Sequence, residues 1–98
     1  MLFEWDPDKN TSNKKKHGIS FEAAILVFAD PDARSIFDEE HSDEEERWVT
    51  LGMVQSGKIL LVIHTDRIKI DDKTVIRVIS ARKATDNESR QYTRFNKR

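Results

Sequence analysis

The alternation of polar and apolar residues predicts a short strand and a helix at the start of the chain. Residues 3–5 (Phe-Glu-Trp) have the pattern of a strand. Asp6 is a typical N-cap and Pro7 suits the first helical position, so a helix is predicted to run to about His17. Gly18 can end it in the left-handed conformation. Because this helix has no apolar residue between its ends, it lacks a hydrophobic stripe for packing.

A second helix and a series of strands follow. Ser20 is the predicted N-cap, Asp30-Pro31-Asp32 ends this helix, and its apolar stripe consists of Phe21, Ala24, Ile25 and Phe28. Four strands are predicted at about 34–38, 46–54, 58–67 and 74–82. Residues 55–57 form a tight hairpin turn and residues 68–73 a looser loop. Thr85-Asp86-Asn87-Glu88 is a capping box, which predicts a closing helix from about residue 86.

This order of elements indicates an α+β fold: a short N-terminal strand and two helices, a four-stranded antiparallel meander, and a C-terminal helix. The 98 residues fit a single domain, residues 1–98, which can bury one modest core.

Side-chain alternation in the meander predicts a row of cations on one face. If the 55–57 turn is tight and the 68–73 loop symmetric, Arg47, His64 and Arg77 lie side by side on neighbouring strands. Such groups repel each other unless an anion or a carboxylate joins them. The opposite face, which holds Ile59, Leu61 and Ile63, is more apolar, so we expect the helices to pack there.

Composition narrows the class of protein. Apolar residues make up 37% and charged residues 36% of the chain, and no apolar run approaches the roughly 18–20 residues that cross a bilayer. The N-terminus lacks the features of a signal peptide. The absence of cysteine excludes disulfides and Cys-based zinc sites and agrees with a reducing cytoplasm. His17, His41 and His64 do not have metal-ligand spacing, so no metal or other cofactor is expected.

The net charge of −1 conceals an uneven distribution. Residues 30–46 hold nine of the eighteen acids and a single base, Arg34. Residues 47–98 hold twelve bases and five acids. A nucleic-acid-binding protein needs a local positive surface rather than a positive total. The C-terminal half is therefore either such a surface or an ordinary solvated surface of mixed charge.

The last predicted strand carries the strongest chemical signal. Arg77 interrupts its apolar run, and Arg82 lies where the strand should end. A guanidinium in or beside a core is costly unless something pairs with it. With Tyr92 on the following helix, the two arginines suggest an anion site, and we favour an RNA phosphate. The alternatives are pairing of Arg77 with Asp66, a simple edge role for Arg82, and a packing role for Tyr92.

Motifs along nearly the whole chain resemble those of the BrnT family, ribonuclease toxins of bacterial type II toxin–antitoxin pairs. These motifs are Phe3-Glu4-Trp5-Asp6 with Lys9 and Asn13, residues 16–23 (KHGISFEA), Phe28 with Asp30-Pro31, Asp38 with His41-Ser42, Glu46-Arg47-Trp48 with Gly52, Thr65 with Arg67, residues 76–84 (IRVISARKA), and Glu88-Ser89-Arg90 with Tyr92. The resemblance implies a RelE-like fold, RNA cleavage to arrest growth, and a bacterial cytoplasmic location. It also implies a BrnA-like antitoxin, a ribbon-helix-helix DNA-binding protein that forms a hetero-oligomer with the toxin. Operator DNA would be bound only through this antitoxin.

These motifs support a hypothesis of metal-independent endoribonuclease activity. Such cleavage needs the 2′-hydroxyl deprotonated, the phosphate charge stabilised and the 5′-oxygen protonated. Arg77 and Arg82 are assigned to the phosphate, with Arg67 assisting, because the guanidinium fork matches phosphate oxygens. Tyr92 would orient a base or transfer a proton, and His64 or His17 is the conventional acid–base candidate. The expected RNA-binding residues are Lys16, His17, Arg47, Lys83 and Arg90.

A second hypothesis belongs to a different class. The chain could be a non-catalytic module that binds the antitoxin or another protein and has lost ribonuclease activity. The slightly negative net charge favours this alternative, because a polyanion is not attracted by it.

Overall fold

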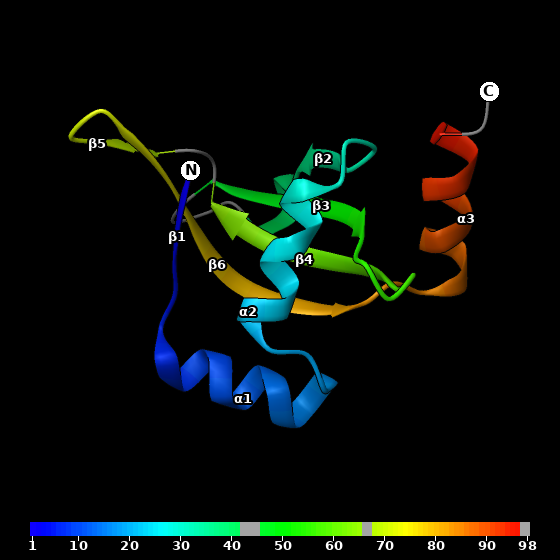
Figure 1. Ribbon diagram of the computed structural model, residues 1–98, viewed down its shortest axis with the longest axis horizontal. Helices are drawn as coiled ribbons and strands as arrows, with labels where there is room; N and C mark the ends of the chain where they lie inside the picture. The colour runs from blue at the N-terminus through cyan, green and yellow to red at the C-terminus, as the bar shows by residue number, and fades with distance from the viewer. Residues whose placement is uncertain (42–45, 66–67, 97–98) are drawn as a thin grey trace.

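The computed structural model describes residues 1–41, 46–65 and 68–96. Its α+β class agrees with the prediction (Figure 1). The first half holds β1 (Leu2–Glu4), α1 (Pro7–His17), α2 (Phe21–Ala24) and the 3₁₀ helix η1 (Ile25–Ala29). The second half holds β2 (Arg34–Phe37), the 3₁₀ turn η2 (Glu39–His41), β3 (Arg47–Met53), β4 (Ile59–Thr65), β5 (Ile68–Ile70), β6 (Lys73–Lys83) and α3 (Asp86–Asn96).

The predicted capping signals all act as expected. The Asp6 carboxylate accepts from the backbone N–H of Asp8, and Gly18 ends α1 with φ 71°. The Ser20 hydroxyl accepts from the N–H of Ala23 at the start of α2. At α3, Thr85 and Glu88 each accept from the other's backbone N–H. The helix starts were therefore readable from local sequence.

The sheet is mixed and has six strands, in the order β1-β6-β4-β3-β2, with β5 also paired to β6. It differs from the predicted meander in two strands. β1 runs parallel to β6, whereas the other pairs are antiparallel. Residues 68–70, predicted as loop, form β5, and Asp71 and Asp72 make its turn with φ of 50° and 64°. Residues 66–67, predicted to end the third strand, lie outside the described residues.

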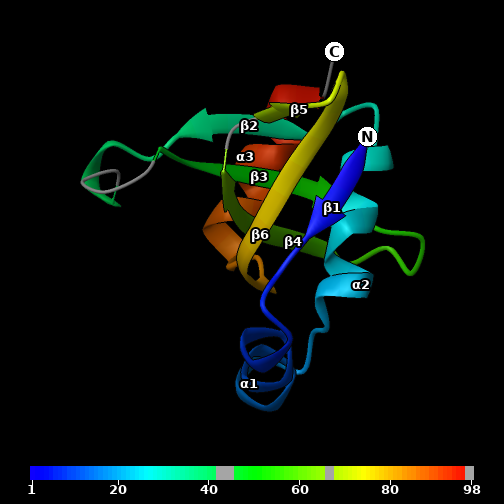
Figure 2. The ribbon, with the colours of Figure 1, turned by 90° about the vertical axis from the view of Figure 1, so that its left-hand side faces the viewer.

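One face of the sheet is covered by α2 and η1, whereas α1 lies beside β6 (Figures 1 and 2). The core lies between α2–η1 and the sheet, and its fully or almost fully buried residues are Phe21, Ala24, Val27, Leu60, Val62, Val78 and Ala81. α1 has no apolar stripe. It is attached to β6 through the side-chain amide of Asn13 instead. The Asn13 amide donates to the carbonyl oxygens of Ala81 and Ile19, and its oxygen accepts from the N–H of Ala81.

The predicted register was wrong by one residue. Met53 pairs with Ile59, because residues 54–58 close the hairpin through Val54 N–H donating to the Lys58 carbonyl at 2.9 Å. This places Leu60 and Val62 on the helix side, in place of the predicted Ile59, Leu61 and Ile63.

The predicted row of Arg47, His64 and Arg77 therefore does not exist. His64 pairs with Trp48 on β3 and points to the helix side, while Arg47 pairs with Thr65 one position along. An irregularity in β6 adds to this difference, since Ile63 pairs with Ser80 but His64 pairs with Val78.

Candidate functional site

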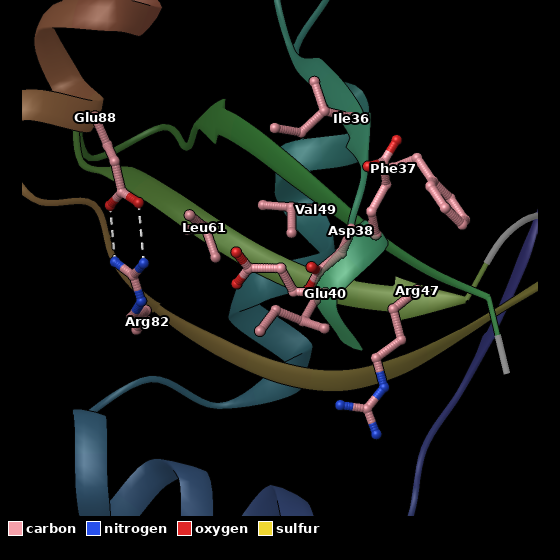
Figure 3. Close-up of a pocket in the computed structure, with 11 residues that line it drawn as sticks. Ile36, Phe37, Asp38, Glu40, Arg47, Val49, Leu61, Arg82 and Glu88 are labelled. Atoms are coloured by element: carbon pink, nitrogen blue, oxygen red, sulfur yellow. Dashed lines mark hydrogen bonds and ion pairs between the residues drawn. The ribbon is translucent and has the colours of Figure 1, made fainter. Parts of the chain in front are cut away.

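The face of the sheet opposite the helices bears an open hollow of about 720 Å³, shown in Figure 3. Its apolar base consists of Ile36, Val49, Leu61 and Ile63. Arg47 and Arg82 lie at opposite ends (Figure 3). The other residues that line this hollow are Phe37, Asp38, Glu39, Glu40 and Glu88. Cross-strand pairing explains the arrangement: Ile36, Val49 and Ile63 are successive partners across β2, β3 and β4, and Leu61 pairs with Arg82.

The Arg82 guanidinium is bound by a carboxylate at the end of the hollow. Arg82 Nη1 and Nη2 donate to Glu88 Oε1 and Oε2 at 2.7 and 2.9 Å (Figure 3). The bonds from Arg82 lower the pKa of Glu88 to about 2, and the same contact raises the pKa of Arg82. A phosphate is bound by arginine with the same bidentate geometry, so an anion at Arg82 would compete with Glu88.

Tyr92 joins α3 to the rest of the molecule. It is buried, and its hydroxyl donates to Asp30 Oδ2 at 2.5 Å. Burial, followed by the bond to Asp30, raises the pKa of Tyr92 to about 12, so the phenol stays protonated near neutrality. Tyr92 does not line the hollow.

Asp30 binds Tyr92 and so connects α3 to the rest of the chain. The sequence alone identifies it only as part of a helix end. Besides Tyr92, its carboxylate accepts from the N–H groups of Met53 at 2.7 Å and Asp32 at 2.9 Å. Burial acts to raise its pKa, but these hydrogen bonds together lower it.

His64 is buried on the helix side of the sheet. Its Nδ1 lies 2.6 Å from the carbonyl oxygen of Thr65, and its Nε2 lies 2.6 Å from the Thr50 hydroxyl. A carbonyl only accepts, so Nδ1 carries the proton and, in the neutral ring, Nε2 accepts from Thr50. The Thr50 hydroxyl is also 2.7 Å from that of Ser35. His64 is thus part of a buried polar chain rather than of the hollow.

The other predicted site residues are dispersed. The Arg77 side chain is exposed on β6, opposite Glu4 of β1. Arg67 lies outside the described residues. Four expected RNA-binding residues are exposed elsewhere: Lys16 and His17 on the last turn of α1, Lys83 at the end of β6, and Arg90 on α3. Of the predicted set within the described residues, the hollow gathers Arg47 and Arg82.

Carboxylates are the main residues of the hollow that sequence reasoning missed. Asp38, Glu39, Glu40 and Glu88 outnumber the two arginines of its lining. The acids of residues 30–46 were noted from the sequence, but no local pattern placed them beside Arg82. Within the described residues, no group of three or more His, Asp or Glu is placed to hold a metal ion. No helix described in the structure has the length and apolarity to cross a membrane.

Two comparisons with known proteins agree. Residues 5–88 match the model of the ribonuclease toxin BrnT of type II toxin–antitoxin systems, and the chain belongs to this family. The fold is similar to the 1.1 Å crystal structure of the Brucella abortus ribonuclease toxin BrnT, with a TM-score of 0.62 and 22% identity. That match covers 87% of this chain and 99% of the Brucella chain. Comparison with curated proteins gives no match.

Proposed function

We propose that this chain is a metal-independent endoribonuclease toxin, of RelE-like architecture, that binds the RNA backbone at the hollow. The observation that supports this function best is the open hollow with Arg47 and Arg82 at its ends, in a chain of a ribonuclease toxin family. Membership of a toxin–antitoxin family implies an antitoxin partner. We expect a ribbon-helix-helix antitoxin that binds operator DNA on behalf of the pair, in the bacterial cytoplasm.

The proposed reaction is attack of an RNA 2′-oxygen on the adjacent phosphorus. The new 2′-O–P bond forms as the P–O5′ bond breaks, and the 2′-hydroxyl proton leaves while the 5′-oxygen gains one. Arg82 would exchange Glu88 for the phosphate and stabilise its developing charge. Carboxylates are the proton acceptors present in the hollow, and Glu40 and Glu39 are assigned this role.

The remaining predicted residues take peripheral roles in this proposal. Arg77, with Lys16, His17, Lys83 and Arg90, would contact flanking phosphates as exposed cations, and Arg67 is assigned to assist at the scissile phosphate. Tyr92 acts as a positioning residue, because its hydroxyl is bound to Asp30. His64 supports the sheet from the helix side and is not assigned acid–base chemistry.

Cleavage of a single-stranded RNA by the purified chain, with a metal chelator present, tests the proposal. Wild type should cleave, and Arg82→Ala should cleave about 100-fold more slowly, as expected for loss of a donor to the transition-state charge. Lys58→Ala is the matched control, since Lys58 is an exposed cation on the hairpin away from the hollow. A urea unfolding curve shows that each variant is folded. Equal rates for wild type and Arg82→Ala would refute the assigned site.

A second candidate function is a protein-binding module without catalysis. The Arg82–Glu88 pair and the excess of carboxylates in the hollow favour it, because both disfavour a polyanion. Binding of a protein partner with no RNA cleavage at any enzyme concentration would support this candidate.

A further inference from the structure

We propose that the hollow is the docking site for a basic amphipathic helix of a partner protein. The inference rests on the proposed function only for the identity of that protein, the antitoxin. The docking itself follows from the apolar base of the hollow, the charge of its rim and the missing helical layer on this face.

The base of the hollow is an apolar surface that the described chain covers only in part, with Leu61 buried and Ile36 exposed. Ile36 keeps 65% of its surface exposed, and Val49 and Ile63 are half-buried beside it in one cross-strand row. Neighbouring strands are about 4.8 Å apart, so the row spans about 10 Å, the width of one helix. On the other face of the sheet, α2 and η1 bury the equivalent apolar row. A helix docked in the hollow would complete a second layer.

The charge of the rim selects the kind of helix. Four carboxylates and two guanidiniums line the hollow, and Arg82 is already neutralised by Glu88. Glu39 and Glu40 are exposed. A helix with apolar anchors flanked by lysine or arginine matches this rim, whereas an acidic helix or a nucleic acid meets repulsion in this resting arrangement.

A partner helix bound in the hollow would inhibit the proposed nuclease. A helix in the hollow covers Arg47 and Arg82 together, so it excludes RNA by occupying the same space. RNA must separate Arg82 from Glu88 before it can bind, but a basic helix leaves that pair intact.

Binding of two synthetic helical peptides to the full chain tests the proposal. Both peptides have about 14 residues with leucine at helical spacing; one carries lysine and the other glutamate at the remaining positions. Fluorescence anisotropy should show that the lysine peptide binds at least tenfold more tightly, with affinity falling as salt rises. The double variant Glu39→Gln/Glu40→Gln should weaken the lysine peptide about tenfold. Equal weakening by Asp71→Asn/Asp72→Asn, which makes the same charge change in the β5–β6 turn, would overturn the proposal.

A second pair of variants tests the apolar base. Ile36→Thr keeps a β-branched residue in β2 and should weaken the lysine peptide about threefold or more. Ile70→Thr, at an isoleucine of β5 that is also exposed (52%), should have no effect. If both isoleucine variants bind like wild type, the peptide is held by charge alone and no helix occupies the hollow. Tighter binding of the glutamate peptide, or of a short RNA, at the hollow would also refute the proposal. Because no cleavage is measured, these outcomes are independent of whether the chain is an active nuclease.

Discussion

At the scale of single residues, Gly52 controls how closely η1 approaches the sheet. A Cβ at this position would lie 2.8 Å from Val27 Cβ and 3.1 Å from the Val27 carbonyl oxygen. Val27 is fully buried, and the contact includes backbone, so rotation of a side chain cannot relieve it. We predict that Gly52→Ala lowers the free energy of unfolding by about 1–3 kcal/mol, which urea denaturation would measure.

Met53→Ala, at an exposed position next in the strand, is a suitable control for the Gly52 prediction, with an expected change within about 0.5 kcal/mol. Undiminished stability of Gly52→Ala would show that η1 can move away from β3 without loss.

Residues whose role depends on a local partner were predictable, and those with distant partners were not. Ser20 and Thr85 act on groups three residues away, so the sequence alone identified them as caps. Tyr92 finds its partner 62 residues away in Asp30, and no local pattern could indicate this contact. The assignment of Tyr92 to RNA therefore rested on residue type alone.

At the scale of elements, Asn13 attaches α1 to the exposed edge of β6. β1 pairs with β6 only at residues 75–77, and beyond them the Asn13 amide bonds both backbone groups of Ala81 in place of a strand. Asn13→Ala would leave these buried groups unpaired, so we predict a loss of about 2–3 kcal/mol in the free energy of unfolding. Ser12→Ala, on the exposed face of the same helix, should change it by about 0.5 kcal/mol or less. If both variants lost a similar free energy of unfolding, the bonds from Asn13 to Ala81 would not be what attaches α1 to the sheet.

The elements themselves were predictable, but their register was not. Alternation of side chains located β2, β3, β4 and β6 to within a residue or two. The face assignment of β4 depends on the length of the 54–58 connection, and one residue reverses every side chain. A register error of one residue explains why the predicted row of cations is not observed. Arg47 lines the hollow, but His64 points to the other face of the sheet.

At the scale of the whole molecule, the helices are attached to the sheet in two different ways. α2 and η1 pack on it through an apolar core. α3 is joined to the rest of the chain by several polar contacts. Glu88 binds Arg82, Tyr92 binds Asp30, the Asn96 amide donates to the Asp32 carbonyl oxygen at 3.2 Å, and Arg34 lies 4.1 Å from the centre of the Phe95 ring. Composition could not separate these roles, because the acids of residues 30–46 both line the hollow and hold α3.

Two carboxylates with lowered pKa values make the attachment of α3 sensitive to acid. Glu88 changes from its ordinary pKa of 4.5 to about 2, mainly through Arg82, and the pKa of Asp30 is also lowered. A group with a lowered folded-state pKa stabilises the fold above its unfolded value and loses that contribution as pH falls through the folded value. Because the Glu88–Arg82 pair is partly exposed, we expect it to contribute about 1–2 kcal/mol, lost between about pH 4.5 and pH 2. Hydrogen exchange at pH 3 should show α3 amides exchanging faster relative to those of β4 and β6 than at pH 6, once intrinsic rates are corrected. In Glu88→Gln this pH-dependent difference should shrink, because glutamine does not titrate; an undiminished difference would place the acid-sensitive attachment elsewhere.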